Sequence, residues 1–157
     1  MIRVDPDTVL REAALDAMQR AYAPYSGFRV GAALLGADGR IFVGCNVENV
    51  AYGEAICAER AAVLAAVVAG VRDFTRIAIA TEADHAAPPC GACRQVLAEF
   101  APALPVMSYT LGGDSRHWTI ADLLPFPFTP NYLDEVAAHH TAEHRAHLPP
   151  PLPADRA

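Results

Sequence analysis

The sequence predicts an α/β fold with three layers in α-β-α order around a central mixed five-stranded sheet. Two observations predict it. Segments whose apolar residues recur at helical spacing alternate with short apolar runs, in the order helix, hairpin, helix, strand, helix, strand. Strands joined through a helix favour parallel βαβ crossovers, whereas a hairpin is antiparallel, so the expected sheet is mixed.

The first third of the chain predicts a helix followed by a hairpin. Asp5 suits an N-cap and Pro6 suits the first helical position, so a helix is expected from there to about Arg20. A strand is then expected over 28–35. The Asp-Gly pair in the turn at 37–39 leads into a second strand over 40–45.

The rest of the chain predicts helices and strands in alternation. A helix rich in alanine and valine is expected over 57–69, ending at Gly70, because glycine favours helix C-termini. The remaining elements follow in chain order: a strand over 76–81, a helix over 90–100, and strands over 106–110 and 117–120.

Length and composition predict a single domain over 1–135 and a tail over 136–157. A chain of 157 residues, 53% of them hydrophobic, is long enough to bury a proper core. Beyond about residue 136 the large apolar residues become few. Four histidines there lie among prolines, which is typical of a flexible end, with a secondary metal site as the alternative: His139, His140, His144 and His147.

The charge pattern excludes several classes of function. The net charge is -6, lysine is absent, and the 12 basic residues are arginines spread along the chain, so no nucleic-acid partner is expected. Without lysine, neither Schiff-base chemistry nor a P-loop is expected.

The longest apolar run, 61–71, is too short to cross a bilayer, and no signal-type stretch is found. Cysteines in such a chain indicate a reducing compartment, with the cytoplasm as the expected location and no membrane contact.

Three cysteines and one glutamate carry the chemistry that the sequence predicts. Cys57, Cys90 and Cys93 can hold a zinc ion as thiolates and leave its fourth position open to water. Glu59, two residues after the first cysteine, can then move the proton of that water. A closed structural site needs a fourth protein ligand, and the single CxxC here comes without a second pair. The pattern therefore favours a catalytic zinc site.

The spacing of these residues constrains their geometry. Both cysteine elements fall where predicted helices begin, and the partial positive charge there favours thiolates. Cys90 and Cys93 are three residues apart, so they share one face of the first turn. Cys57 and Glu59 would be separated by roughly 200° on a regular helix. They can face one metal ion only if Cys57 lies at the very start of its helix.

Arg60, three residues after Cys57, is expected to donate to the thiolate sulfurs. Such a donor would withdraw charge from a thiolate-rich zinc site and lower the pKa of bound water; an ordinary surface charge is the alternative. For the three cysteines, the alternatives are buried thiols or a structural zinc site with His85 as fourth ligand. Cys45, at the end of a strand, is expected to be a small core residue.

The ordered set of motifs resembles the zinc-dependent cytidine deaminases of the short-chain, three-cysteine, homotetrameric type. The resemblance covers roughly residues 5–133. It rests on Cys-Ala-Glu-Arg at 57–60 and Pro-Cys-Gly-Ala-Cys-Arg-Gln at 89–95, supported by the segments 23–28, 30–34, 44–49, 52–53 and 123–128. Zinc deaminases are known to bind the metal with such a ligand set and to use a glutamate as the general acid-base group. A fold of the cytidine deaminase type and one Zn²⁺ per subunit are implied.

The resemblance also implies which residues hold the substrate. Asn46 and Glu48 match the pair that binds the ribose hydroxyls, and Phe28 matches an aromatic residue that packs against the nucleoside. Ala58 falls at a substrate-binding position as well. Two aromatic residues match positions that reach an adjacent subunit's site, which implies a homotetramer with shared sites: Tyr52 and Phe128. Glu54, where an apolar residue is common, departs from the family pattern.

The activity that the resemblance implies is hydrolytic deamination of cytidine and 2′-deoxycytidine to uridine and 2′-deoxyuridine, with release of ammonia, as in pyrimidine salvage. Glu59 would shuttle protons from the activated water to the ring nitrogen and then to the departing amine. Three alternatives stay open. The chain could deaminate a related nucleoside such as blasticidin S, act on a polynucleotide, or be a non-catalytic, zinc-stabilised binding module.

Overall fold

The computed structural model describes residues 5–133. The chain divides into two compact units, Met1–Pro127 and Phe128–Ala157. The expected domain boundary at residue 135 and the expected tail over 136–157, with its four histidines, lie outside the described residues. The central sheet and the helices that pack on it belong to the first unit.

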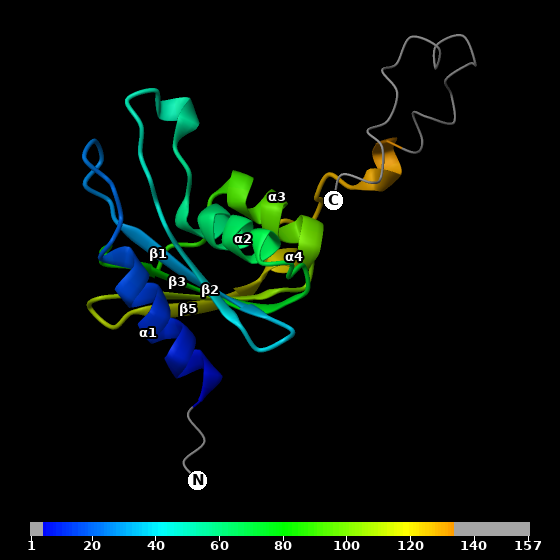
Figure 1. Cartoon of the computed structure of the whole chain (residues 1–157), viewed down its shortest axis with the longest axis horizontal. Coiled ribbons are helices and arrows are strands. Elements are labelled where there is room, and N and C mark those ends of the chain that lie inside the picture. The colour runs from blue at the N-terminus through cyan, green and yellow to red at the C-terminus, as the bar shows by residue number, and fades with distance from the viewer. Residues whose placement is uncertain (1–4, 134–157) are drawn as a thin grey trace. The chain divides into compact units, whose positions relative to one another are not determined.

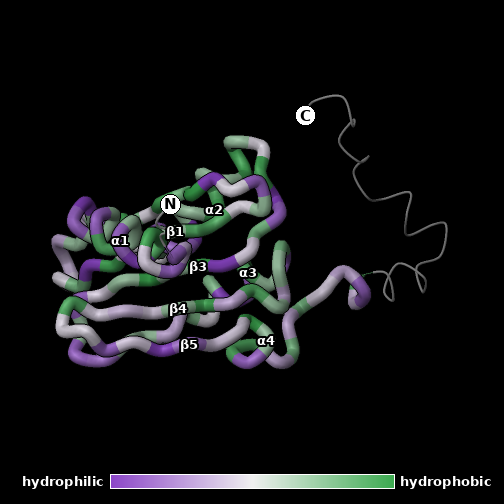
Figure 2. Tube along the Cα trace, turned by 90° about the horizontal axis from the view of Figure 1, so that it is seen from below, coloured by the Kyte–Doolittle hydropathy of each residue, from purple (hydrophilic) through white to green (hydrophobic). Residues whose placement is uncertain are grey.

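A five-stranded sheet forms the centre of this unit, as the sequence predicts. Its strands lie in the order β2-β1-β3-β4-β5, and Figure 2 shows β1, β3, β4 and β5 in that order. The bounds are β1 (Val30–Gly36), β2 (Ile41–Cys45), β3 (Phe74–Thr81), β4 (Pro105–Thr110) and β5 (Ser115–Thr119).

The pairing of the strands confirms the predicted mixed sheet. Among the described strands, β3 and β4 form the one parallel pair, with Ile77 opposite Val106, and the other three pairs are antiparallel. Strands β2 and β3 also run parallel to each other, because both are antiparallel to β1, which lies between them. The expected parallel crossovers are therefore present as β2-α2-β3, which passes over β1, and β3-α3-β4, which joins neighbouring strands.

Helices cover both faces of the sheet, which confirms the three-layer α-β-α architecture. Figure 1 shows α1 (Pro6–Met18) on one side and α2 (Ala58–Val68), α3 (Gly91–Phe100) and α4 (Ile120–Leu123) on the other. Asp5 is the N-cap of α1, and its Oδ1 accepts from Asp7 N at 3.3 Å. No helix of the described residues is long and apolar enough to cross a membrane.

Two short helices were not predicted. The 3-10 helix η1 (Tyr52–Glu54) and α4 are too short to show a helical period in the sequence. Helix α4 begins with a capping box, in which Thr119 Oγ1 accepts from Asp122 N and the Asp122 carboxylate accepts from Thr119 N. Such a reciprocal pair can start a helix of one turn without an apolar stripe.

Strand β1 begins at Val30, two residues later than predicted, because side chains bind the backbone before it. Phe28 N donates to Ser26 Oγ at 3.0 Å, and Phe28 O accepts from Asn46 Nδ2 at 2.8 Å. These bonds replace the ladder hydrogen bonds that a strand residue would make. The segment before β1 is therefore shaped by Ser26 and Asn46.

The core consists of two apolar clusters separated by the sheet. The smaller cluster lies under α1 and is built from Leu10, Ala14, Met18, Ala33, Ala78, Ala80 and Met107. The larger cluster packs α2, α3 and α4 against the opposite face and includes Ala62, Ala66, Ile77, Ile79, Leu97, Val106 and Ile120. Both faces of β3 are thus buried, consistent with its central position and apolar sequence.

Glycines set how closely the helices approach the sheet. A Cβ on Gly44 of β2 would overlap Ala58 O and lie 2.5 Å from Ala62 N, both backbone atoms of α2. A Cβ on Gly31 of β1 would overlap the backbone of α1 in the same way. Because only glycine permits this approach, Gly44 fixes the height of the N-terminus of α2 above the sheet. That N-terminus carries Cys57 and Glu59.

Candidate active site

Two of the three cysteines occupy helix N-caps. Cys57 precedes α2 with φ -74° and ψ 155°, and Cys90 precedes α3 with φ -65° and ψ 165°. Neither side chain makes a capping hydrogen bond, although most N-cap side chains do. Cys93 lies in the first turn of α3 and is buried. The extended backbone at Cys57 is the arrangement that the spacing to Glu59 requires.

The three cysteine sulfurs converge on one point. All three Sγ atoms lie within 4.8 Å of one another, and Cys57 Sγ is 3.8 Å from Cys90 Sγ. Zinc–sulfur bonds of about 2.3 Å at tetrahedral angles separate the sulfurs by roughly 3.8 Å. The donor set therefore fits a zinc ion held by Cys57, Cys90 and Cys93.

Proton sharing within the cluster favours a thiolate at Cys57. A hydrogen bond from the Cys93 thiol lowers the pKa of Cys57 to about 5, and the Arg60 guanidinium contributes in the same direction. The same hydrogen bond, together with burial, raises the pKa of the Cys93 thiol. One sulfur of the group is thus already anionic near neutral pH, which prepares the site for a cation.

Arg60 makes the contact that its spacing predicts. Its Nη2 atom donates to Cys57 Sγ at 3.5 Å and to Ala55 O at 2.9 Å. The second bond ties the guanidinium to the segment just before α2, so its position relative to the sulfur is fixed from both sides. Arg60 therefore lies against the cluster and is not an ordinary surface charge.

Glu59 is buried beside the cysteines. Among the described residues it is the one charged side chain classed as buried, with 5% of its surface exposed. Burial raises the pKa of its carboxyl group, and the negative charge on Cys57 acts in the same direction. A carboxyl group with a raised pKa, next to a metal site, is suited to taking up and releasing protons.

A pocket of about 320 Å³ opens beside this carboxyl group. Its lining residues come from the segment before β1, the end of β2, the start of α2, β3 and the segment before α3. Four residues predicted to bind substrate line it together with the metal site and Glu59: Phe28, Asn46, Glu48 and Ala58. The structure thus brings residues spread over more than sixty positions of the chain to one cavity.

Asn46 and Glu48 also hold the pocket wall in shape. Asn46 Oδ1 accepts from Val30 N, and its Nδ2 donates to Phe28 O, both at 2.8 Å. Glu48 accepts from Tyr25 N at 2.9 Å, from Ser26 N at 3.2 Å, and from the Ser26 hydroxyl. These bonds, of which the one from the Ser26 hydroxyl has the largest effect, hold the pKa of the Glu48 carboxyl group below its usual value. Glu48 is therefore a fixed carboxylate at the pocket edge.

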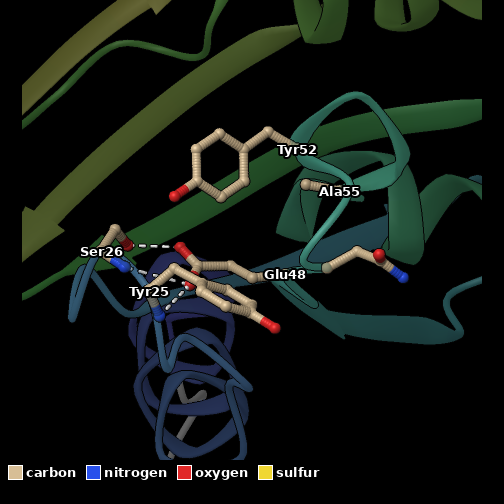
Figure 3. A pocket seen from close by; sticks show the side chains of 6 residues that line it. Tyr25, Ser26, Glu48, Tyr52 and Ala55 are labelled. Atoms are coloured by element: carbon tan, nitrogen blue, oxygen red, sulfur yellow. Dashed lines mark hydrogen bonds between the residues drawn. The ribbon is translucent and has the colours of Figure 1, made fainter.

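Tyr52 lies in a neighbouring hollow and does not line the pocket with Glu59. This second cavity, of about 290 Å³, is lined by Tyr25, Ser26, Glu48, Asn49, Tyr52 and Ala55. Figure 3 shows Tyr25 and Tyr52 beside the Ser26–Glu48 hydrogen bonds, and their rings meet edge to face at 6.0 Å. Glu48 and Ser26 belong to both cavities, so the two are adjacent.

Three further predicted residues lie elsewhere. Phe128 belongs to the second unit, where its ring stacks on Tyr132 at 5.5 Å. His85 has a side chain that is 89% exposed and lies 4.0 Å from Asp114, and it is not part of the cysteine cluster. Cys45 is half-buried, with its Sγ donating to Arg20 O, so its expected place in the core is corrected. It sits where β2 leaves the sheet.

Sequence reasoning missed the polar role of Ser26 and the pocket-lining role of Pro88. Ser26 lies in the Ala-Pro-Tyr-Ser segment that supports the family resemblance, but its contact with Glu48 joins residues 22 positions apart. Pro88 lines the wall beside Cys90. A proline two residues before a CxxC pair would have been the signal for a rigid wall.

A buried carboxyl group beside a three-thiol metal site, with a pocket next to both, is typical of a hydrolytic zinc enzyme. A family model described as "cytidine and deoxycytidylate deaminase zinc-binding region" matches residues 5–108. The cytidine deaminase of Sporosarcina psychrophila is 48% identical over 122 residues, covering 77% of this chain and 90% of that protein. The cytidine deaminase of Halalkalibacterium halodurans is 44% identical over 133 residues, covering 84% and 100%.

Solved structures agree with these relatives. The crystal structure of cytidine deaminase from Burkholderia pseudomallei superposes with a TM-score of 0.75 at 47% identity, covering 82% of this chain and 100% of that one. The chain belongs to the cytidine and deoxycytidylate deaminase family.

Proposed function

We propose that this protein hydrolyses cytidine and 2′-deoxycytidine to uridine and 2′-deoxyuridine, releasing ammonia. One observation carries the proposal. The buried carboxyl group of Glu59 lies beside the three-cysteine cluster and lines the same pocket as Asn46 and Glu48. Acid-base chemistry and groups able to hold a sugar are therefore within reach of a single small molecule.

The residues of the pocket have separate roles in the proposed reaction. A zinc ion bound by Cys57, Cys90 and Cys93 would polarise a water molecule and lower its pKa. Glu59 takes one proton from the attacking water and passes it to the ring nitrogen beside the reacting carbon. It then transfers a second proton from the same water to the departing amine. The water oxygen thus replaces the amino group, and Glu59 ends in its starting state.

The ribose is held at the other end of the pocket. Glu48 accepts three hydrogen bonds within the protein, and a carboxylate has roughly four acceptor sites, so one stays open for a hydroxyl group. The Asn46 amide, fixed between Val30 N and Phe28 O, has one N–H and one lone pair left. A pair of adjacent hydroxyls matches these open positions, and the Phe28 ring offers an apolar surface nearby.

We also propose the finer expectations as part of this function. The active form is a homotetramer in which Phe128 and Tyr52 reach adjacent sites, and the protein serves pyrimidine salvage in the cytoplasm. Large exposed apolar residues on α2 support an assembly, because Val68 is 90% and Leu64 57% exposed. The catalytic domain extends over 1–135, followed by the His- and Pro-rich tail.

Ultraviolet assays on four substrates test the proposal. Cytidine and 2′-deoxycytidine should be turned over, turnover should stop with a zinc chelator, and added zinc should restore it. Blasticidin S and single-stranded DNA or RNA are assayed in parallel, and light scattering on the same sample measures the oligomeric state. Turnover of blasticidin S alone would favour the related-nucleoside function, and activity on polynucleotides would contradict the small-molecule assignment.

A non-catalytic zinc module makes a different prediction. It needs a fourth protein ligand, and His85 is the candidate that the sequence offers. Zinc content after His85→Ala should stay at one per chain, because His85 points to Asp114 and not to the thiols. Loss of zinc in that variant would support the structural function.

A further inference from the structure

The segment between β3 and α3 forms one wall of the pocket and presents a metal ligand. Ala87, Pro88 and Cys90 of this segment line the pocket. Pro89, between them, is fully buried, and its carbonyl oxygen accepts from Arg94 Nε at 2.7 Å. Arg94 lies in α3, the helix that begins at the CxxC motif, but is not among the residues that line the pocket.

The same guanidinium reaches a second element. Arg94 Nη1 donates to Leu123 O, in the last turn of α4, at 2.9 Å. Helix α4 is itself anchored, because Thr119 and Asp122 form its capping box and Ile120 N donates to Leu104 O. Arg94 therefore braces the Pro89 carbonyl against a part of the fold that is held independently.

The residue before Cys90 has only one backbone dihedral that is free to rotate. The pyrrolidine ring locks φ of Pro89 near -65°, so the orientation of the Pro89–Cys90 peptide depends on ψ of Pro89. That angle sets the direction of the Pro89 carbonyl, which is the group that Arg94 holds. Fixing the carbonyl therefore fixes the plane of the Pro89–Cys90 peptide. With φ of Cys90 at -65° and Cys90 O accepting from Arg94 N at 3.0 Å, this plane sets the direction in which the Cys90 side chain leaves the backbone.

From this geometry we propose that Arg94 is a positioning residue for the metal centre. By bridging Pro89 O and Leu123 O, it aims Cys90 Sγ at the point where the three sulfurs converge. The inference rests on the proposed function in that this centre is the catalytic one. Metal–ligand distances tolerate only about 0.2 Å, and partners outside the ligand shell typically change metal affinity or activity about 10–100-fold.

Cys90 needs such a support more than the other two ligands. Cys93 is buried within the first turn of α3, and Cys57 is held by Arg60. Cys90 is exposed, and its side chain makes no capping bond. The planar guanidinium of an arginine has donors in two directions and can bridge two carbonyl groups. A lysine ammonium at the same place can satisfy at most one of them well.

Zinc affinity, measured by competition with a chromophoric chelator in the absence of nucleoside, tests the proposal. Arg94→Met should bind zinc about 10–100-fold more weakly than the unchanged protein, and Arg94→Lys should recover part of that loss. Arg72→Met, at an exposed arginine of the turn between α2 and β3, is the matched control and should keep full affinity. At saturating zinc, kcat should fall in Arg94→Met while KM for cytidine stays within about twofold.

A second variant separates positioning from general support of the loop. Asp114 Oδ2 accepts from Ala86 N at 2.8 Å, in the middle of the same segment. Asp114→Ala should raise KM with zinc affinity unchanged, because it removes the acceptor of Ala86 N and so loosens the pocket wall and not the ligand. Unfolding temperatures with and without zinc complete the comparison, and Arg94→Met should lose more in the zinc-bound form.

Two results would overturn the proposal. One is unchanged zinc affinity in a folded Arg94→Met protein. The other is an Arg94→Met protein that does not fold, together with an Arg94→Lys protein of full zinc affinity, since Arg94 would then be a purely structural residue. Failure of the proposed function is distinguishable, because a protein that binds zinc but does not deaminate cytidine leaves the affinity comparison intact.

Discussion

Arg60 and Cys57 form the contact that ties a positive charge to the metal centre. The guanidinium Nη2 lies 3.5 Å from Cys57 Sγ and is held in place by a 2.9 Å bond to Ala55 O. Three thiolates around a dication leave a net negative site, which would weaken it as a Lewis acid. A fixed donor on one sulfur withdraws part of that charge.

Replacing Arg60 should therefore lower activity more than it lowers folding stability. In Arg60→Met we expect kcat for cytidine to fall about 10–100-fold, because the donor to Cys57 is lost. Steady-state kinetics with parallel zinc analysis measure this. Arg20→Met, which removes an exposed ion pair to Asp16 on α1, is the control and should behave like the unchanged protein. Full activity of Arg60→Met would show that the charge on the sulfurs is unimportant.

Glu59→Gln should abolish most turnover while the protein keeps its zinc and fold. The amide preserves the size of the buried side chain but cannot take up and release protons, so we expect a loss of about 10²–10⁴-fold or more in kcat. The measurement is the absorbance change on cytidine, with zinc content determined on the same sample. Glu99→Gln, at an exposed position of α3, serves as control. Near-normal turnover in Glu59→Gln would remove this residue from the mechanism.

Gly44→Ala should damage both stability and activity, although Gly44 does not line the pocket. Its new Cβ would overlap Ala58 O and push α2, with Cys57 and Glu59, away from β2. Overpacking of this kind costs about 1–3 kcal/mol in the free energy of unfolding. Thermal unfolding and zinc affinity report the two effects. Gly53→Ala, whose Cβ would meet no atom within 4 Å, should leave the unfolding temperature nearly unchanged.

Ser26→Ala should make substrate binding more sensitive to acid. The Ser26 hydroxyl is the first cause that holds the pKa of Glu48 below its ordinary value of 4.5, followed by Tyr25 N. A lowered pKa means that the ionised, hydrogen-bonded form is complete above the ordinary value and is lost only as pH falls through the lower one. Without the hydroxyl, Glu48 should gain its proton at higher pH.

The comparison is best made as a ratio between proteins. KM for cytidine in Ser26→Ala, divided by KM in the unchanged protein, should increase as the pH is lowered from 7 toward 4.5. Ser115→Ala, on an exposed position of β5, should give a ratio near one throughout. A ratio for Ser26→Ala that does not depend on pH would mean that the charge on Glu48 is not what binds the sugar.

Much of the fold could be predicted because its signals are local. The N-cap at Asp5, the Asp-Gly turn of the hairpin and the apolar period of α2 each act over a few residues. The start of β1 and the helix α4 could not be predicted in the same way. The first depends on Asn46, 16 residues from Val30, and the second on one reciprocal capping pair.

By itself, the sequence determined the chemical identity of the site: three thiols, one carboxyl group and a guanidinium at helix starts, in an order that matches one family. Only the tertiary structure decided how these groups meet. Cys57 and Cys90 come within 3.8 Å because α2 and α3 pack side by side on the same face of the sheet, and Gly44 sets the height of α2 above it. The support that Ser26 gives Glu48 and Arg94 gives Pro89 also depends on the fold, because such contacts join atoms whose separation only packing determines.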